Sequence, residues 1–172
     1  MLRVIPLGGL GEIGLNMMVC EAADAMLVVD AGLMFPEDHM LGVDFVIPDM
    51  SFVRLNRHRL KGIVLTHAHE DHIGALPFLL KDVHVPVFGT AFTLGLVRQK
   101  LAEFEVPASA GLHLIAPGQP LALDPFRIDF IRVGHSVVDG VGLAIHTPEG
   151  LLVHTGDFKI SPGAAGGMST DL

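Results

Sequence analysis

The sequence lacks tryptophan and tyrosine and contains a single cysteine, Cys20. One cysteine cannot form a disulfide within the chain. No run reaches the roughly 18 apolar residues of a membrane span, and the N-terminus lacks the basic-then-apolar pattern of a signal peptide. We therefore expect a cytoplasmic protein that does not cross a membrane.

Positively charged residues are also few: Lys and Arg total 11 against 19 Asp and Glu, which gives a formal net charge of −8. This acidic balance argues against nucleic-acid binding by the chain itself. Half of the 172 residues are hydrophobic, which allows a sizeable core, and the mean hydropathy is +0.53. So high a value predicts either a dense core or a chain that buries one face against something outside it.

The hydrophobic pattern predicts short strands near both ends of the chain with helices between them. Apolar spacing near 3.6 residues favours a helix over 90–105, and a second helix is expected to begin within 73–82, with Pro77 tolerated in its first turn. Residues 33–50 have no clean period and predict a long loop. Strands are expected at 2–7, 25–30, 61–67, 85–89, 112–118 and within 120–136, with a hairpin over 140–158.

A literal G-x-G-x-x-G motif occurs at Gly9, Gly11 and Gly14, and Asp30 follows it at the end of an apolar run. This combination is typical of a dinucleotide-binding turn. Such a site needs a helix to begin at the third glycine, facing the pyrophosphate. Residues 15–30 instead favour a strand, a turn and a second strand. We therefore expect no NAD site, and a tight glycine loop beside another centre.

The strongest signal is the H-x-H-x-D-H stretch that contains His67, His69, Asp71 and His72. Imidazole and carboxylate together are typical ligands of zinc, manganese or iron. In an extended segment residues i and i+2 point the same way, so His67 and His69 can share one ion. Asp71 and His72 fall in the first turn of the following helix, where they can face a second ion. The alternative is a solvated polar loop.

Three further residues stand at the ends of predicted strands. His135 and Asp157 each follow an apolar run, which suits ligands delivered to one edge of a sheet. A carboxylate such as Asp157 can bridge two ions about 3.5–4 Å apart, which can also hold a hydroxide for attack on phosphorus or a carbonyl. Asp30 could orient a ligand imidazole by accepting a hydrogen bond from the ring nitrogen that does not face the ion. His146 and His154 alternate with apolar neighbours, so structural roles are favoured for both.

This order of motifs resembles the metallo-β-lactamase superfamily, and in detail the ribonuclease J family of β-CASP RNA-processing enzymes. The segments that carry the likeness are IPLGGLGEIGLNM, VVDAGLMFPEDHMLGVDFVIPD, LTHAHEDHIGALPFLL, GHSVVDGVGLAIHTPEGLLVHTGDFKI and the final TDL. The resemblance implies an α+β fold, the αββα sandwich of that superfamily, of which only the N-terminal part is present. Residues 1–160 would form this part, and 161–172 would be a linker towards an absent β-CASP domain.

The resemblance also implies a dinuclear metal centre, with zinc expected and manganese as the alternative. His67, His69 and His135 would hold one ion, whereas Asp71, His72 and a bridging Asp157 would hold the other. Asp71, His72 and Asp157 would act in catalysis, with Asp30 behind them. The last histidine ligand of the family would lie beyond residue 172.

The implied parent hydrolyses RNA phosphodiesters, as a 5′-3′ exonuclease and an endonuclease, through a bridging hydroxide. Its RNA would be held mainly by absent domains, the parent would be a homo-oligomer, and the isolated segment would be weakly active or inactive. Two alternatives stay open. One is a small-molecule metallo-hydrolase of the thioesterase or lactonase type, which shares the metal motif. The other is a non-catalytic truncated module.

Overall fold

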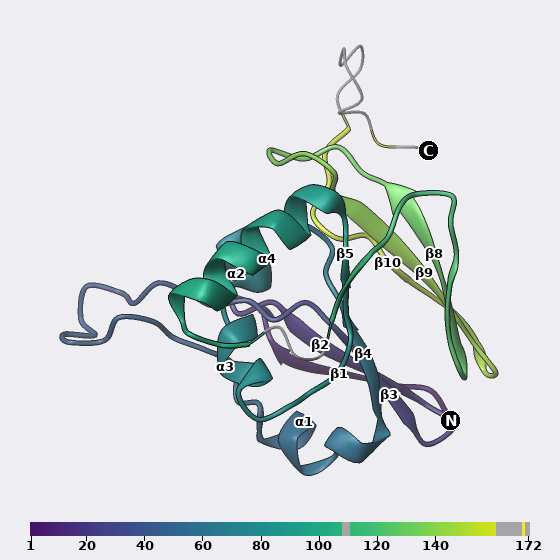
Figure 1. The fold of residues 1–172 in the computed structure, drawn as a ribbon, viewed down its shortest axis with the longest axis horizontal. Coiled ribbons are helices and arrows are strands. Elements are labelled where there is room, and N and C mark those ends of the chain that lie inside the picture. Colours follow the sequence, from purple (N-terminus) through teal and green to yellow (C-terminus); the bar gives the residue numbers. More distant parts are fainter. Residues whose placement is uncertain (108–110, 161–169, 171–172) are drawn as a thin grey trace.

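A computed structural model describes residues 1–107, 111–160 and 170. Its first layer is helical and covers one face of a six-stranded sheet, whose other face packs on a four-stranded sheet (Figure 1). The helices are α1 (Ser51–Leu55), a 3-10 turn at Arg57–Arg59, α2 (Glu70–Ile73), α3 (Leu76–Leu80) and α4 (Ala91–Glu103). None of the helices in this described part has the length and apolar character that crossing a bilayer requires.

The larger sheet has the order β1-β2-β3-β4-β5-β6. Its strands are β1 (Arg3–Gly8), β2 (Met17–Ala22), β3 (Ala25–Val29), β4 (Leu60–Val64), β5 (Val87–Gly89) and β6 (Leu112–Leu114). The first three strands are antiparallel, whereas β3 to β6 run parallel. β3 and β4 are buried along almost their whole length, as expected of strands covered on both faces.

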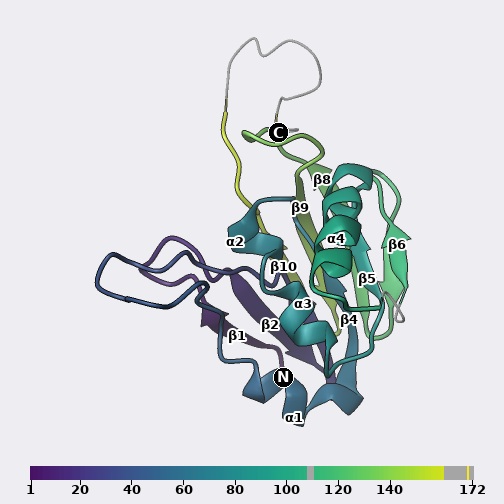
Figure 2. The ribbon, with the colours of Figure 1, turned by 60° about the vertical axis from the view of Figure 1, so that its left-hand side comes forward.

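The smaller sheet has the order β10-β9-β8-β7 and is antiparallel throughout. Its strands are β7 (Leu121–Leu123), β8 (Phe126–Arg132), β9 (Val141–Thr147) and β10 (Gly150–His154). One apolar cluster lies between the two sheets and contains Leu27, Phe126 and Leu143. A second cluster, with Val28, Ile63 and Leu79, joins the larger sheet to the helices, which lie against this sheet in Figure 2.

These layers are three of the four layers in an αββα sandwich. Among the described residues no helix covers the outer face of the smaller sheet (Figure 1). Leu151 and Val153 of β10 are accordingly more than half exposed. Part of the high hydropathy of the sequence therefore comes from apolar side chains on this uncovered face.

Most predicted elements occur where expected, including the helix within 90–105 and the hairpin within 140–158. The helix expected to begin within 73–82 is α3, with Pro77 in its first turn, and α2 precedes it as a separate short helix that carries Asp71 and His72. The two helices are separated where Ala75 N donates to Ala31 O over 2.8 Å, and Gly74 packs closely there, since a Cβ on it would lie 2.4 Å from Leu33 Cγ. Helix α1 was not predicted, and the expected strand over 112–118 ends at Leu114. The linker assigned to 161–172 lies outside the described residues except for Thr170.

The glycine loop follows the strand–turn–strand prediction. β2 begins at Met17 and pairs with β3 across a tight turn at Ala23 and Asp24, so no helix begins at Gly14. The loop carries positive φ angles of 82° at Gly9 and 109° at Gly14, a region that favours glycine. The loop therefore lacks the helix N-terminus that faces the pyrophosphate in a dinucleotide site.

Candidate metal centre

The strand directions bring the predicted residues to one edge of the two sheets. β3 and β4 are parallel, so Asp30 and Thr66, which follow them, lie at the same edge. β8 and β10 both run antiparallel to β9, so their ends also meet there, followed by His135 and Asp157. The two sheets are joined at this point because Val141 N donates to Thr66 O over 2.9 Å.

Three imidazoles converge at this edge. His67 Nε2 lies 3.0 Å from His69 Nδ1, and His135 Nε2 lies 3.2 Å from the same atom. One ligand atom each from His67, His69, His135 and Asp157 falls within 4.8 Å of the other three. The predicted first ligand set, with Asp157 beside it, is therefore gathered in space.

Asp71 and His72 lie beside this group, in α2. His72 Nε2 lies 3.7 Å from Asp71 Oδ2 and 3.6 Å from Asp157 Oδ1. The other oxygen of Asp157, Oδ2, lies 3.6 Å from His135 Nε2. Asp157 therefore faces His135 with one oxygen and His72 with the other, which is the placement that a bridging carboxylate needs.

Asp30 organises the buried side of the centre. Its Oδ1 accepts a hydrogen bond from Thr66 N over 2.7 Å, and its Oδ2 accepts one from Thr66 Oγ1 over 2.8 Å. His72 Nδ1 lies 2.8 Å from the same Oδ2. Burial alone would raise the pKa of Asp30, but the hydrogen bond to His72 and the charge of His72 lower it below the ordinary value.

Thr66 links Asp30 to His67 and fixes which nitrogen of the His67 ring carries the proton. Its single hydroxyl proton goes to Asp30, so Thr66 Oγ1 can only accept from His67 Nδ1, 3.0 Å away. His67 therefore carries its proton on Nδ1 and presents a bare Nε2 to the cluster. Burial and the charge of His72 lower the pKa of His67 to about 4, which keeps the ring neutral, as a metal ligand must be.

His72 has a comparable arrangement. Burial alone would lower its pKa, but the hydrogen bond to Asp30 and the charges of Asp30, Asp71 and Asp157 raise it above the ordinary value. The neutral ring keeps its proton on Nδ1, facing Asp30, and leaves Nε2 bare. The donor set thus fits divalent cations, because imidazole nitrogens of His67, His69 and His135 and a carboxylate oxygen of Asp157 converge within 4.8 Å of one another.

Close backbone packing sets the turn that carries Asp71 and His72. Ala31 N donates to His72 O over 2.8 Å. Leu33 N donates to Glu70 O over 3.1 Å. A Cβ on Gly32 would lie 1.6 Å from Asp71 O, so only glycine allows this approach.

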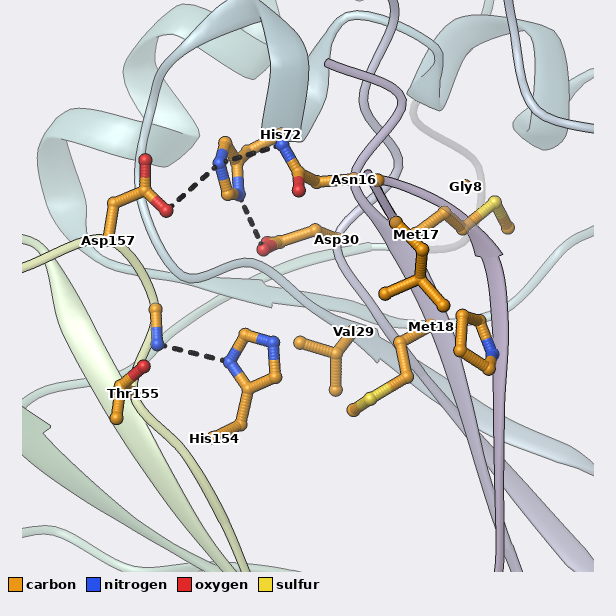
Figure 3. A pocket seen from close by; sticks show the side chains of 14 residues that line it. Gly8, Asn16, Met17, Met18, Val29, Asp30, His72, His154, Thr155 and Asp157 are labelled. Atoms are coloured by element: carbon orange, nitrogen blue, oxygen red, sulfur yellow. Dashed lines mark hydrogen bonds and ion pairs between the residues drawn. The ribbon is translucent and has the colours of Figure 1, made fainter. Parts of the chain in front are cut away.

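A hollow of about 230 Å³ opens beside the centre (Figure 3). Its polar lining includes Asn16, Asp30, His72 and Asp157, and its other side is formed by the glycine loop and β2. His154 also lines it, and its Nδ1 accepts from Gly156 N over 3.1 Å, which steadies the turn before Asp157. This contact fits the structural role expected for His154.

Two residues of the centre were missed at the level of sequence. Asn16 Nδ2 lies 3.1 Å from both Asp71 Oδ2 and His72 Nε2, and Thr66 joins Asp30 to His67. Asn16 is the polar residue that ends the glycine loop before an apolar strand, and Thr66 directly precedes the first histidine. Their positions beside these motifs could have indicated a role in the centre. Both residue types are common in loops, however, so the positions alone did not distinguish them.

Comparison with known proteins agrees with this geometry. Residues 25–169 match the Beta-lactamase superfamily domain. The chain is 46% identical over 177 residues to "Ribonuclease J" of Thermus thermophilus and 43% identical over 171 residues to "Ribonuclease J" of Helicobacter pylori. Each alignment covers 99% of this chain, but only 31% and 25% of those proteins respectively.

Solved structures show the same fold at lower identity. The metallo-β-lactamase fold protein YhfI from Bacillus subtilis aligns over 94% of this chain and 65% of its own, with a TM-score of 0.63 and 22% identity. A protein of unknown function from Enterococcus faecalis aligns over 92% of this chain and 44% of its own, with a TM-score of 0.71 and 19% identity. From the family match, the fold and the gathered ligand residues together, the chain belongs to the β-lactamase superfamily and has the metallo-β-lactamase fold.

Proposed function

We propose that the chain is the metal-holding part of a hydrolase that cleaves RNA phosphodiester bonds. The observation that carries the proposal is the convergence of His67, His69, His135 and Asp157 in a chain 40–46% identical to ribonuclease J proteins. The chain spans about a quarter to a third of the length of these relatives. The activity of the longer protein is therefore proposed from this similarity, and the geometry of the centre supports the proposal.

His67, His69 and His135 would hold one divalent ion, and Asp71 with His72 a second, with Asp157 between them. Such ions supply Lewis-acid charge and make bound water acidic enough to attack phosphorus near neutral pH. Nitrogen and carboxylate ligands suit zinc first and manganese next. Three carboxylates, Asp30, Asp71 and Asp157, would repel a phosphodiester, so cations are required before an anionic substrate can approach.

The residues of the chain hold and orient the reacting groups. Asp30 and Thr66 fix the His67 and His72 rings, and Asp71, with a one-third exposed side chain, can take a proton at the mouth of the centre. Gly9 and Gly156 line the hollow beside it, where the lack of side chains lets a phosphate approach the backbone closely. Recognition of the RNA strand, its 5′ end and the balance of exonuclease and endonuclease activity would depend on a β-CASP domain outside this chain. A homo-oligomeric state and a cytoplasmic location also stay predictions.

The test is cleavage of 5′-labelled RNA by the 172-residue chain and by a protein that contains it, with Mn²⁺ or Zn²⁺ and then with a chelator. We expect the longer protein to shorten RNA only with metal ions, and the isolated chain to be nearly inactive. His69→Ala should abolish activity, whereas His58→Ala, at an exposed position in the 3-10 turn, should retain it.

Thioester and lactone substrates assayed in parallel separate the alternatives. Hydrolysis of these compounds with no RNA cleavage would replace the ribonuclease assignment by a small-molecule hydrolase. Metal binding without any hydrolysis in the longer protein would favour a non-catalytic module.

A further inference from the structure

Asn16 is held rigidly at the centre by its backbone. Its N–H donates to Asp71 O over 3.1 Å, and its carbonyl accepts from Gly32 N over 2.9 Å. Gly9 leaves room for its side chain, because a Cβ there would lie 2.7 Å from Asn16 Oδ1. The glycine loop therefore delivers one particular amide to the turn that carries Asp71 and His72.

The amide nitrogen of Asn16 lies 3.1 Å from Asp71 Oδ2 and 3.1 Å from His72 Nε2. The carboxylate of Asp71 can only accept, so it fixes which end of the amide faces it. In its neutral form, which is the form that can bind a cation, His72 donates through Nδ1 to Asp30, so its Nε2 is an acceptor. The two amide protons of Asn16 thus serve the two groups that would hold the second ion, and Asn16 and Asp157 approach the His72 ring from opposite sides (Figure 3).

The number of lone pairs decides what these contacts mean for a cation. A carboxylate oxygen has two lone pairs, so Asp71 Oδ2 can accept from Asn16 and still bind an ion. A neutral imidazole has one bare nitrogen with one lone pair. His72 Nε2 can therefore accept from Asn16 or bind an ion, but not both.

We infer that the Asn16 amide competes with the second cation for His72 Nε2 and that it must leave His72, while keeping Asp71, when that cation binds. This inference rests on the proposed two-ion centre. It makes Asn16 a positioning residue that sets the affinity of the second ion position selectively, because within the described residues no hydrogen bond joins Asn16 to His67, His69 or His135.

The test is a Zn²⁺ titration of the chelator-treated chain, followed by NMR of the histidine ring nitrogens, which reports His72 and His67 separately. In Asn16→Ala, the Zn²⁺ concentration at which the His72 ring-nitrogen signal has changed by half is expected to be about three- to tenfold lower than in the wild type. The reason is that one hydrogen bond no longer has to be broken. His67 should respond within about twofold of the wild type. Before zinc is added, the Nε2 resonance of His72 should already move in this variant.

Asn56→Ala is the matched control, because Asn56 is the other asparagine and its amide donates to Phe52 O at the end of α1. It should leave both histidines unchanged. An Asn16→Ala chain in which His72 needs as much zinc as the wild type, or more, would overturn the inference while leaving the metal centre intact. Absence of a zinc response at every histidine of the wild type would instead remove the metal centre on which the proposed function depends.

Discussion

Asp30 Oδ2 lies 2.8 Å from His72 Nδ1 and is almost completely buried. Through Thr66 the same oxygen also fixes the His67 ring. One carboxylate at the end of β3 therefore orients a histidine of each predicted ion position. Its φ of 60° lies in the left-handed region, which Asp tolerates better than most side chains.

Asp30→Asn is expected to lower the unfolding free energy by about 3 kcal/mol, because an amide nitrogen would face the proton donors of Thr66 and His72 at a buried position. Zn²⁺ affinity should fall about 10–100-fold, as for other groups that orient ligands. Chemical unfolding and zinc titration measure both effects. Asp129→Asn, which alters the 2.7 Å contact with His146 on the smaller sheet, is the control, and equal losses in the two variants would contradict this role.

Gly32→Ala is expected to cost at least about 3 kcal/mol or to prevent folding, since its Cβ would lie 1.6 Å from Asp71 O. The same substitution at Gly95, within α4, meets nothing within 4 Å. Gly95→Ala should raise stability by about 0.5–1 kcal/mol, because alanine is the better helix former. Unfolding midpoints of both variants test the pair, and a mild Gly32→Ala would show that the turn is loosely packed.

The pKa of His67, lowered from 6.5 to about 4, predicts how the stability of the metal-free chain depends on pH. Between these values the unfolded chain binds a proton at His67 that the folded chain does not. Stability from this residue is therefore complete above pH 6.5 and is lost as pH falls towards about 4. Urea unfolding with a chelator, from pH 7 to 4, should show a shallower slope in His67→Asn than in the wild type, whereas His58→Asn at the exposed site should keep the wild-type slope.

Metal content should separate the two ion positions. We expect up to two zinc ions per wild-type chain, and loss of the ion between the three imidazoles in His67→Ala. Asp71→Ala should lose the other ion and keep this one, because Asp71 lies outside the four-residue group. Elemental analysis after dialysis gives the counts, with circular dichroism to check folding. Loss of all zinc from a folded Asp71→Ala chain would indicate a single, shared position.

The centre was predictable from sequence to the extent that its chemistry is local. His67, His69, Asp71 and His72 share one short stretch, and His135 and Asp157 each follow an apolar strand. Strand ends of the same direction meet at one edge, so their convergence could be expected. Whether these residues bind ions in the roles assigned to them stays a prediction.

Asn16 and Thr66 could not be predicted in the same way, because their roles depend on which segments pack together. Asn16 meets Asp71 only because β2, β3 and α2 approach within hydrogen-bonding distance. The break between α2 and α3 likewise involves Ala31, which is distant in sequence and accepts from Ala75 N. Such contacts follow from tertiary packing, and they cannot be predicted from hydrophobic periodicity or from residue type.

The groups that meet at the centre extend from Asn16 to Asp157. A chain grows from its N-terminus and its parts begin to fold during synthesis. The histidine stretch at 67–72 is therefore made long before His135 and Asp157 can join it. All the residues of the proposed ion positions come together only after the two sheets have docked, so a newly made chain would complete these positions late in its folding.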